Sequence, residues 1–164
     1  MLIPAALRFG TIKIFDHIIY FEETRPQQGG KTFLMAFNPE KDPAPIEVLP
    51  SNIELRTKVN EYGGCSFDVA KDGIYFVEKN SSQVWFCTHE LTLKQLTHSP
   101  HRFAELLWTP LGLVAVEEKT FTNDASHVGQ RLVLISTING QITPRHFRAG
   151  FFFKTTYQKT QLCF

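Results

Sequence analysis

Helical patterning and long apolar runs are both missing from this sequence of 164 residues. No window of eleven or more residues carries apolar side chains at the i, i+3, i+4, i+7 spacing of an amphipathic helix. No run approaches the roughly 18 apolar residues that a membrane-spanning helix needs. The start, MLIPAALRFG, lacks the basic amino-terminal region of a secretory signal, and its apolar stretch is too short for one. We therefore expect a cytoplasmic chain that is neither helical nor embedded in a membrane.

The sequence also has little net charge and few cysteines. The formal net charge is +1, whereas nucleic-acid binders usually carry a concentrated basic excess. Cys65, Cys87 and Cys163 are odd in number and lack the spacing of metal ligands, which agrees with reduced thiols in the cytoplasm. The sequence therefore predicts no cofactor, no metal site, and no nucleic-acid or membrane partner.

Aromatic residues are abundant instead. Phenylalanine alone occurs 15 times, and aromatic and β-branched side chains suit the pleated surface of a sheet. Short runs of such residues recur between turn signals, including Lys71-Asp72-Gly73 and Asn139-Gly140. The chain is predicted to be all-β.

The predicted strands repeat in rounds of four. The second strands of the rounds read HIIYFEE, GIYFVE and GLVAVEE, and the third strands read KTFLMAF, QVWFCT and QRLVLIS. A period of roughly 40 to 55 residues with four short strands is typical of β-propeller blades. We expect a partial propeller over 1–146, with about three blades near 8–50, 55–98 and 102–146, and an atypical tail at 147–164. The alternative is a β-sandwich with accidental similarity between its segments.

A distinctive block lies between the first two rounds, in the stretch LRTKVNEYGGCSFDVAKDGIYFVEKNSSQVW. It resembles the R-x-x-V-H-E-Y-G-G-G block in the amino-terminal propeller of the prolyl oligopeptidase family, in its acylaminoacyl-peptidase and dipeptidyl-aminopeptidase branch. The matching positions are Arg56, Val59, Glu61, Tyr62, Gly63 and Gly64. Asn60 and Cys65 replace a histidine and a glycine of that block. Weaker likeness, including YFEETRPQQGGKTF and HRFAEL, extends it over about 7–143.

The resemblance implies a serine peptidase whose catalytic residues lie in a carboxy-terminal α/β-hydrolase domain. This sequence has no G-x-S-x-G elbow and no strand–helix alternation after residue 144. We therefore expect a non-catalytic amino-terminal propeller segment, not an enzyme on its own, from a truncated or frame-shifted gene. A stand-alone protein-interaction module and one subunit of a split peptidase are the alternatives.

About three blades form an open stack, because propellers of this family have about seven. The two end faces of such a stack should be apolar and uncovered. We expect the chain to self-associate or to bind a complementary propeller or hydrolase chain.

The family block supplies the first candidate site. Arg56, Glu61, Tyr62, Gly63 and Gly64 are interpreted as blade-packing residues. The alternative is that Arg56, Glu61 or Tyr62 faces the central channel or the peptidase interface. Gly63 or Gly64 is expected to have a positive φ or a backbone packed too closely for a Cβ atom, where the chain joins the innermost strand of the second blade.

Glu22 and Glu23 form the second candidate site. The resemblance points to paired acids that bind the free amino terminus of the substrate in some dipeptidyl peptidases. Carboxylates in a cavity suit an ammonium group. Glu117-Glu118 occupies a similar blade position, which favours a structural repeat feature instead.

Overall fold

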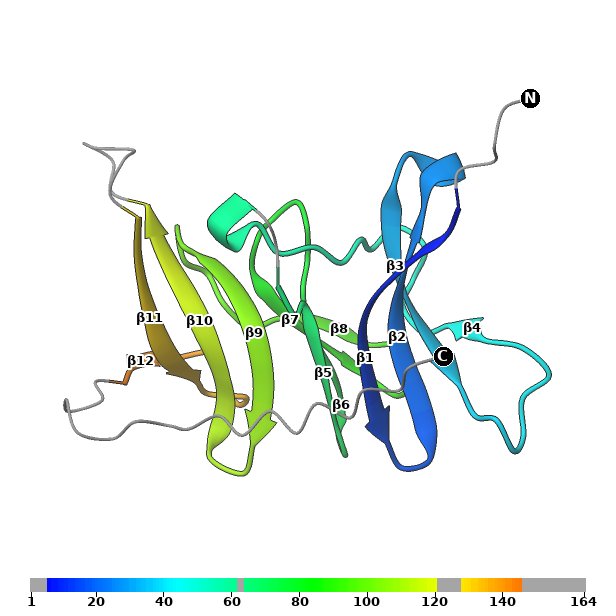
Figure 1. Ribbon diagram of the computed structural model, residues 1–164. Coiled ribbons are helices and arrows are strands. Elements are labelled where there is room, and N and C mark those ends of the chain that lie inside the picture. Colours follow the sequence, from blue (N-terminus) through cyan, green and yellow to red (C-terminus); the bar gives the residue numbers. More distant parts are fainter. Residues whose placement is uncertain (1–5, 62–63, 121–127, 146–164) are drawn as a thin grey trace, which may run out of the picture.

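The computed structural model describes residues 6–61, 64–120 and 128–145, and these fold into three antiparallel sheets of four strands (Figure 1). In each sheet the strands pair in their order along the chain. Blade 1 contains β1 (Arg8–Phe15), β2 (Ile18–Arg25), β3 (Lys31–Phe37) and β4 (Ile46–Glu47). Blade 2 contains β5 (Phe67–Ala70), β6 (Gly73–Val77), β7 (Val84–Thr88) and β8 (Leu93–Gln95). Blade 3 contains β9 (Arg102–Thr109), β10 (Gly112–Thr120), β11 (Val128–Ile135) and β12 (Ile142–Pro144).

The predicted all-β partial propeller is confirmed. Each sheet lies within one of the three predicted rounds, and the described residues contain only two helical elements, the 3-10 turns η1 (Pro26–Gln28) and η2 (Val59–Glu61). Neither turn is long or apolar enough to cross a membrane. The tail at 147–164 lies outside the described residues.

The first strands of the three blades lie side by side. β5 contacts both β1 and β9, and the remaining strands of blades 1 and 3 extend away on opposite sides (Figure 1). This is the arrangement of neighbouring propeller blades, whose innermost strands line a common channel.

Blade 2 is buried on both faces because its strand side chains alternate. On β6, Ile74 and Phe76 join a core shared with blade 1, whereas Tyr75 and Val77 join a core shared with blade 3. All five residues of β6 are buried. Complete burial of one such side chain contributes about 1.5–3 kcal/mol, so the two cores fix the blades against each other.

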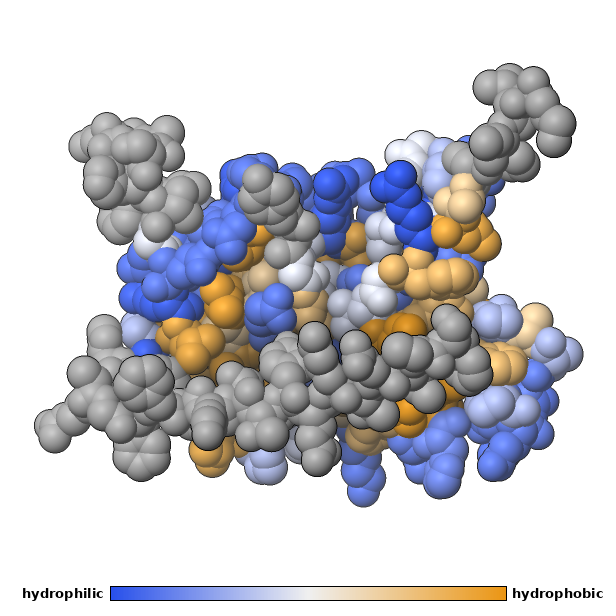
Figure 2. All heavy atoms as spheres, viewed as in Figure 1, coloured by the Kyte–Doolittle hydropathy of each residue, from blue (hydrophilic) through white to orange (hydrophobic). Residues whose placement is uncertain are grey.

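The opposite face of blade 1 is different. Lys13 and Phe15 point toward blade 2, while Ile12 and Ile14 lie on the other face of β1 and are 62% and 74% exposed. Phe9 is 63% exposed and makes an edge contact with the Phe21 ring. No described element covers this row. Figure 2 shows hydrophobic atoms over the middle of the molecule and hydrophilic atoms toward its upper edge.

The segment before β5 also joins blade 2 to blade 3. The Cys65 carbonyl accepts from the Glu105 amide of β9 at 2.9 Å, and β5 begins two residues later, at Phe67.

Candidate functional site

Polar contacts tie the innermost strands together along the channel side. Lys13 Nζ on β1 donates to Asp68 Oδ1 on β5 at 2.8 Å and to the Leu106 carbonyl on β9 at 3.2 Å. The Trp108 amide donates to Asp68 Oδ2 at 2.5 Å. Asp68 is 8% exposed, so these bonds are sheltered from water. One carboxylate thus connects all three blades.

The family block forms a bridge from the crossover between blades 1 and 2 to blade 3. Arg102 on β9 donates from Nη1 to the Lys58 carbonyl at 3.0 Å and to Glu61 Oε1 at 2.5 Å. The Asn60 amide donates to Glu118 Oε2 on β10 at 2.6 Å. Asn60 and Glu61 both have positive φ, 55° and 60°, which turns the chain sharply here. The bond to Arg102 lowers the pKa of Glu61 below its ordinary value.

Asn60 therefore has a definite role where the family block usually has histidine. Its side-chain oxygen accepts from Gln130 Nε2 on β11 at 2.5 Å, so it contacts blade 3 through side chain and backbone alike. Glu61 is held by an ion pair with Arg102. These contacts of Asn60 and Glu61 join the crossover to blade 3.

Gly64 lies just before β5, where close packing was expected of one of the two glycines. A Cβ atom there would lie 2.5 Å from Glu105 Oε1 and 3.4 Å from the Ala104 Cβ. The nearer obstacle is the end of a flexible side chain, which can move if it gives up its 3.3 Å bond from the Cys65 amide. Gly63 and Tyr62 lie outside the described residues.

Glu22 and Glu23 do not form a joint site, because successive strand residues point to opposite faces. Glu22 faces blade 2: its carboxylate accepts the Thr11 amide at 3.0 Å and the Ser66 hydroxyl. Glu23 lies on the other face, where it is paired with Arg25 at 2.6 Å. A paired-acid clamp for an ammonium group would need both carboxylates on one side.

Glu117 and Glu118 are also held by cations. Glu117 pairs with Arg131 of the neighbouring strand, and Glu118 lies 3.4 Å from Arg102. Their side chains are only 2% exposed. The two acid doublets thus resemble each other in sequence position but serve different contacts.

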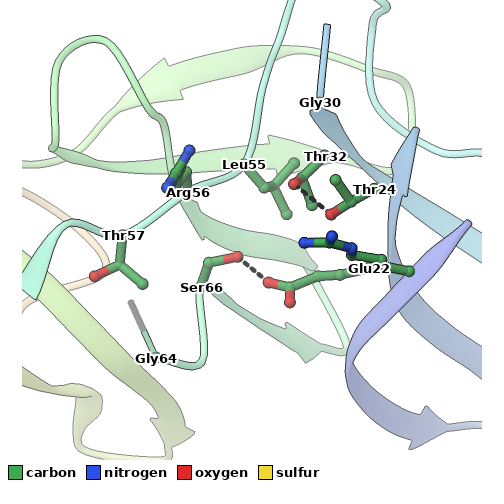
Figure 3. Close-up of a pocket in the computed structure, with 10 residues that line it drawn as sticks. Glu22, Thr24, Gly30, Thr32, Leu55, Arg56, Thr57, Gly64 and Ser66 are labelled. Carbon is green, nitrogen blue, oxygen red and sulfur yellow. Dashed lines mark hydrogen bonds between the residues drawn. The ribbon is translucent and has the colours of Figure 1, made fainter. Parts of the chain in front are cut away.

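A cavity of about 380 Å³ opens between blade 1 and the segment leading into blade 2 (Figure 3). Its lining is formed by Arg8, Glu22, Thr24, Gly30, Thr32, Leu55, Arg56, Thr57, Gly64 and Ser66. Of the candidate residues, it brings Arg56, Gly64 and Glu22 together. No sequence motif singles out the four hydroxyl residues of the lining, because they come from four separate segments: Thr24, Thr32, Thr57 and Ser66.

Groups for nucleophilic or metal chemistry do not converge in the part of the chain that the structure describes. It contains no cluster of three or more His, Cys, Asp or Glu with metal-binding geometry. Burial raises the pKa of the Cys65 thiol, which keeps it protonated. The Ser66 hydroxyl donates to Glu22 and not to an imidazole.

The fold occurs in known peptidases. A puromycin-hydrolysing peptidase of Mycobacterium tuberculosis matches with a TM-score of 0.66 and 20% identity, over 80% of this chain and 22% of that one. A puromycin hydrolase matches with a TM-score of 0.67 and 18% identity, over 77% and 21% of the two chains. A variant of puromycin hydrolase complexed with PGG matches with a TM-score of 0.71 and 17% identity, over 80% and 22%.

These matches confirm the resemblance at the level of the fold. The chain spans about a fifth of the length of the solved structures that it matches. No family model and no curated protein sequence matches it.

Proposed function

We propose that this chain is a non-catalytic propeller segment of the kind found in serine peptidases of the prolyl oligopeptidase family. The observation that carries the proposal is the shared fold, which takes in 80% of this chain but only 22% of the peptidase. The block Arg56 to Gly64 adds support, because it resembles the family's block in sequence and its Asn60 and Glu61 bond to blade 3. On this proposal, peptide hydrolysis is carried out by a hydrolase domain that is not part of these 164 residues.

The chain is further proposed to complete its structure with other blades. A closed propeller covers both faces of every blade, as blades 1 and 3 cover blade 2 here. Phe9, Ile12 and Ile14 form an exposed apolar row on the far side of blade 1. An exposed apolar surface of this kind favours binding to a second copy of the chain, or to a complementary propeller or hydrolase chain as in a split peptidase.

The proposal is tested by assaying the purified chain with aminoacyl and acylaminoacyl reporter substrates, and by labelling it with a fluorophosphonate probe for serine hydrolases. We expect neither turnover nor labelling, because an activated serine and an oxyanion hole supply most of such catalysis. Turnover that the probe abolishes, with labelling of a serine in this chain, would contradict it. A full-length puromycin hydrolase serves as the positive control.

A further inference from the structure

We propose that the cavity between blades 1 and 2 binds a small oxyanion through the guanidinium groups of Arg8 and Arg56. The cavity is large enough for such a group, at about 380 Å³, and Figure 3 shows Arg56 and Thr57 on one side of it and Thr24 and Thr32 on the other. This inference goes beyond the proposed peptidase-type role and does not depend on it.

The threonine hydroxyls near the cavity differ in how they use their hydrogens. The Thr24 and Thr32 hydroxyls bond to each other at 2.9 Å, which uses one of their two hydrogens. Thr57 Oγ1 accepts the Val59 amide at 3.1 Å, so its own hydrogen is not spent on that bond. Figure 3 shows this hydroxyl directed away from Ser66 and Glu22, so the donors that face the cavity are those of Arg8, Arg56 and the Thr24–Thr32 pair.

Glu22 is the one acidic side chain of the cavity, and it already has partners. Its two carboxylate oxygens accept the Thr11 amide and the Ser66 hydroxyl. A cationic ligand would therefore meet two guanidinium groups and a single carboxylate that is already hydrogen-bonded. A ligand with anionic oxygens would instead meet the N–H donors of Arg8 and Arg56.

The charges of the lining side chains also favour an anionic ligand. Arg8 and Arg56 line the cavity with Glu22 as the one acidic side chain, which leaves an excess of one positive charge. Neither guanidinium lies within ion-pair distance of a carboxylate of the described residues. Guanidinium groups bind carboxylate and phosphate through paired N–H donors. The shared chemistry of the ligand is thus a group with two or more anionic oxygens, either free phosphate or the carboxyl terminus of a peptide.

Binding is tested on the full chain by calorimetric titration at low ionic strength, because exposed guanidinium contacts are screened by salt. The probes are inorganic phosphate, N-acetyl-dialanine with a free carboxylate, and its carboxamide. We expect saturable binding of phosphate, of the free carboxylate, or of both, and the stronger of the two identifies the source. The carboxamide should not bind. In NMR spectra, the shifted amides should be those of Gly30, Gly64 and Ser66.

Variants locate the site. Arg56→Gln and Arg8→Gln should each weaken binding of the preferred anion at least about tenfold, since charge-assisted bonds are lost. Arg145→Gln removes the same charge from an exposed position after β12 and should leave affinity within about twofold. Circular dichroism and the melting temperature without ligand should match the parent chain in all three. Absence of anion binding, equal binding of the carboxamide, or unchanged affinity in the Arg8 and Arg56 variants would overturn the proposal.

Discussion

Asp68 is the side chain on which the three innermost strands converge. It accepts from Lys13, from the Val69 amide at 3.0 Å and from the Trp108 amide at 2.5 Å. Asp68→Ala leaves a cation and two amides without that acceptor. We expect the free energy of unfolding to fall by about 2–4 kcal/mol, measured from urea unfolding by tryptophan fluorescence.

The matched control is Glu40→Ala, which removes an exposed carboxylate in the turn after β3. It should change stability by less than about 0.5 kcal/mol. If the two variants unfold at the same urea concentration, the carboxylate does not join the blades.

Gly73, at the turn into β6, is a second position where one atom decides stability. Its φ is +149°, and a Cβ atom would collide with the Cys87 carbonyl of the neighbouring strand. Gly29 also has a positive φ, +71°, but has open space around it. Gly73→Ala should therefore cost about 2–4 kcal/mol and Gly29→Ala about 1 kcal/mol. Thermal unfolding of both variants tests this, and equal losses would show that the collision is relieved without cost.

The joint site of Glu22 and Glu23 could have been ruled out from the sequence alone. Alternation along a strand already separates Glu22 from Glu23, so a joint site was excluded by the predicted strand itself. The partners of Glu117 and Glu118 are a different case. Arg131 contacts Glu117 across a hairpin, and Asn60 contacts Glu118 from the crossover between blades 1 and 2. Neither contact can be inferred from the spacing of these residues in the sequence.

At the scale of elements, the repeat pattern located the strands well. β1 begins at Arg8, where the first predicted round begins, and the continuous apolar run of β6 reflects burial between two blades. The cavity was not predictable, because it depends on how the crossover at 55–57 lies against blade 1. Contacts between blades are long-range, whereas turn and strand signals are local.

The bridge between η2 and β9 gives a prediction about pH. The bond from Arg102 lowers the pKa of Glu61 in the folded chain. Ionised Glu61 therefore stabilises the fold above its unfolded pKa, and this contribution is lost as the pH falls through the folded pKa. In Arg102→Met the pKa of Glu61 should rise toward its ordinary value, as followed by carboxyl carbon NMR.

Glu90 provides the control for that titration. Its pKa is lowered by a bond from the Thr88 side chain, which does not involve Arg102. The Glu90 titration should not move in the Arg102 variant. If Glu61 also keeps its lowered pKa, the ion pair is not present in solution.

At the scale of the whole molecule, the described residues form an open stack of three blades. Blade 2 shows how a blade is covered when neighbours are present on both faces, with Phe67, Phe76, Val77 and Val84 all inaccessible to solvent. Blade 1 has one such neighbour among the described residues and exposes Ile12 and Ile14 on its other face. The fold was predictable from the repeats, but which residues stay uncovered depends on the assembled blades.

Sedimentation velocity over a concentration series, up to tens of micromolar, tests this open stack most directly. We expect the sedimentation coefficient to rise with protein concentration, because association would remove the apolar row on β1 from water. The double variant Ile12→Lys and Ile14→Lys should suppress association, whereas Ile138→Lys, which changes an 84% exposed turn residue, should not. A concentration-independent monomer for the parent chain, with no binding of a dye for apolar surfaces, would contradict the account.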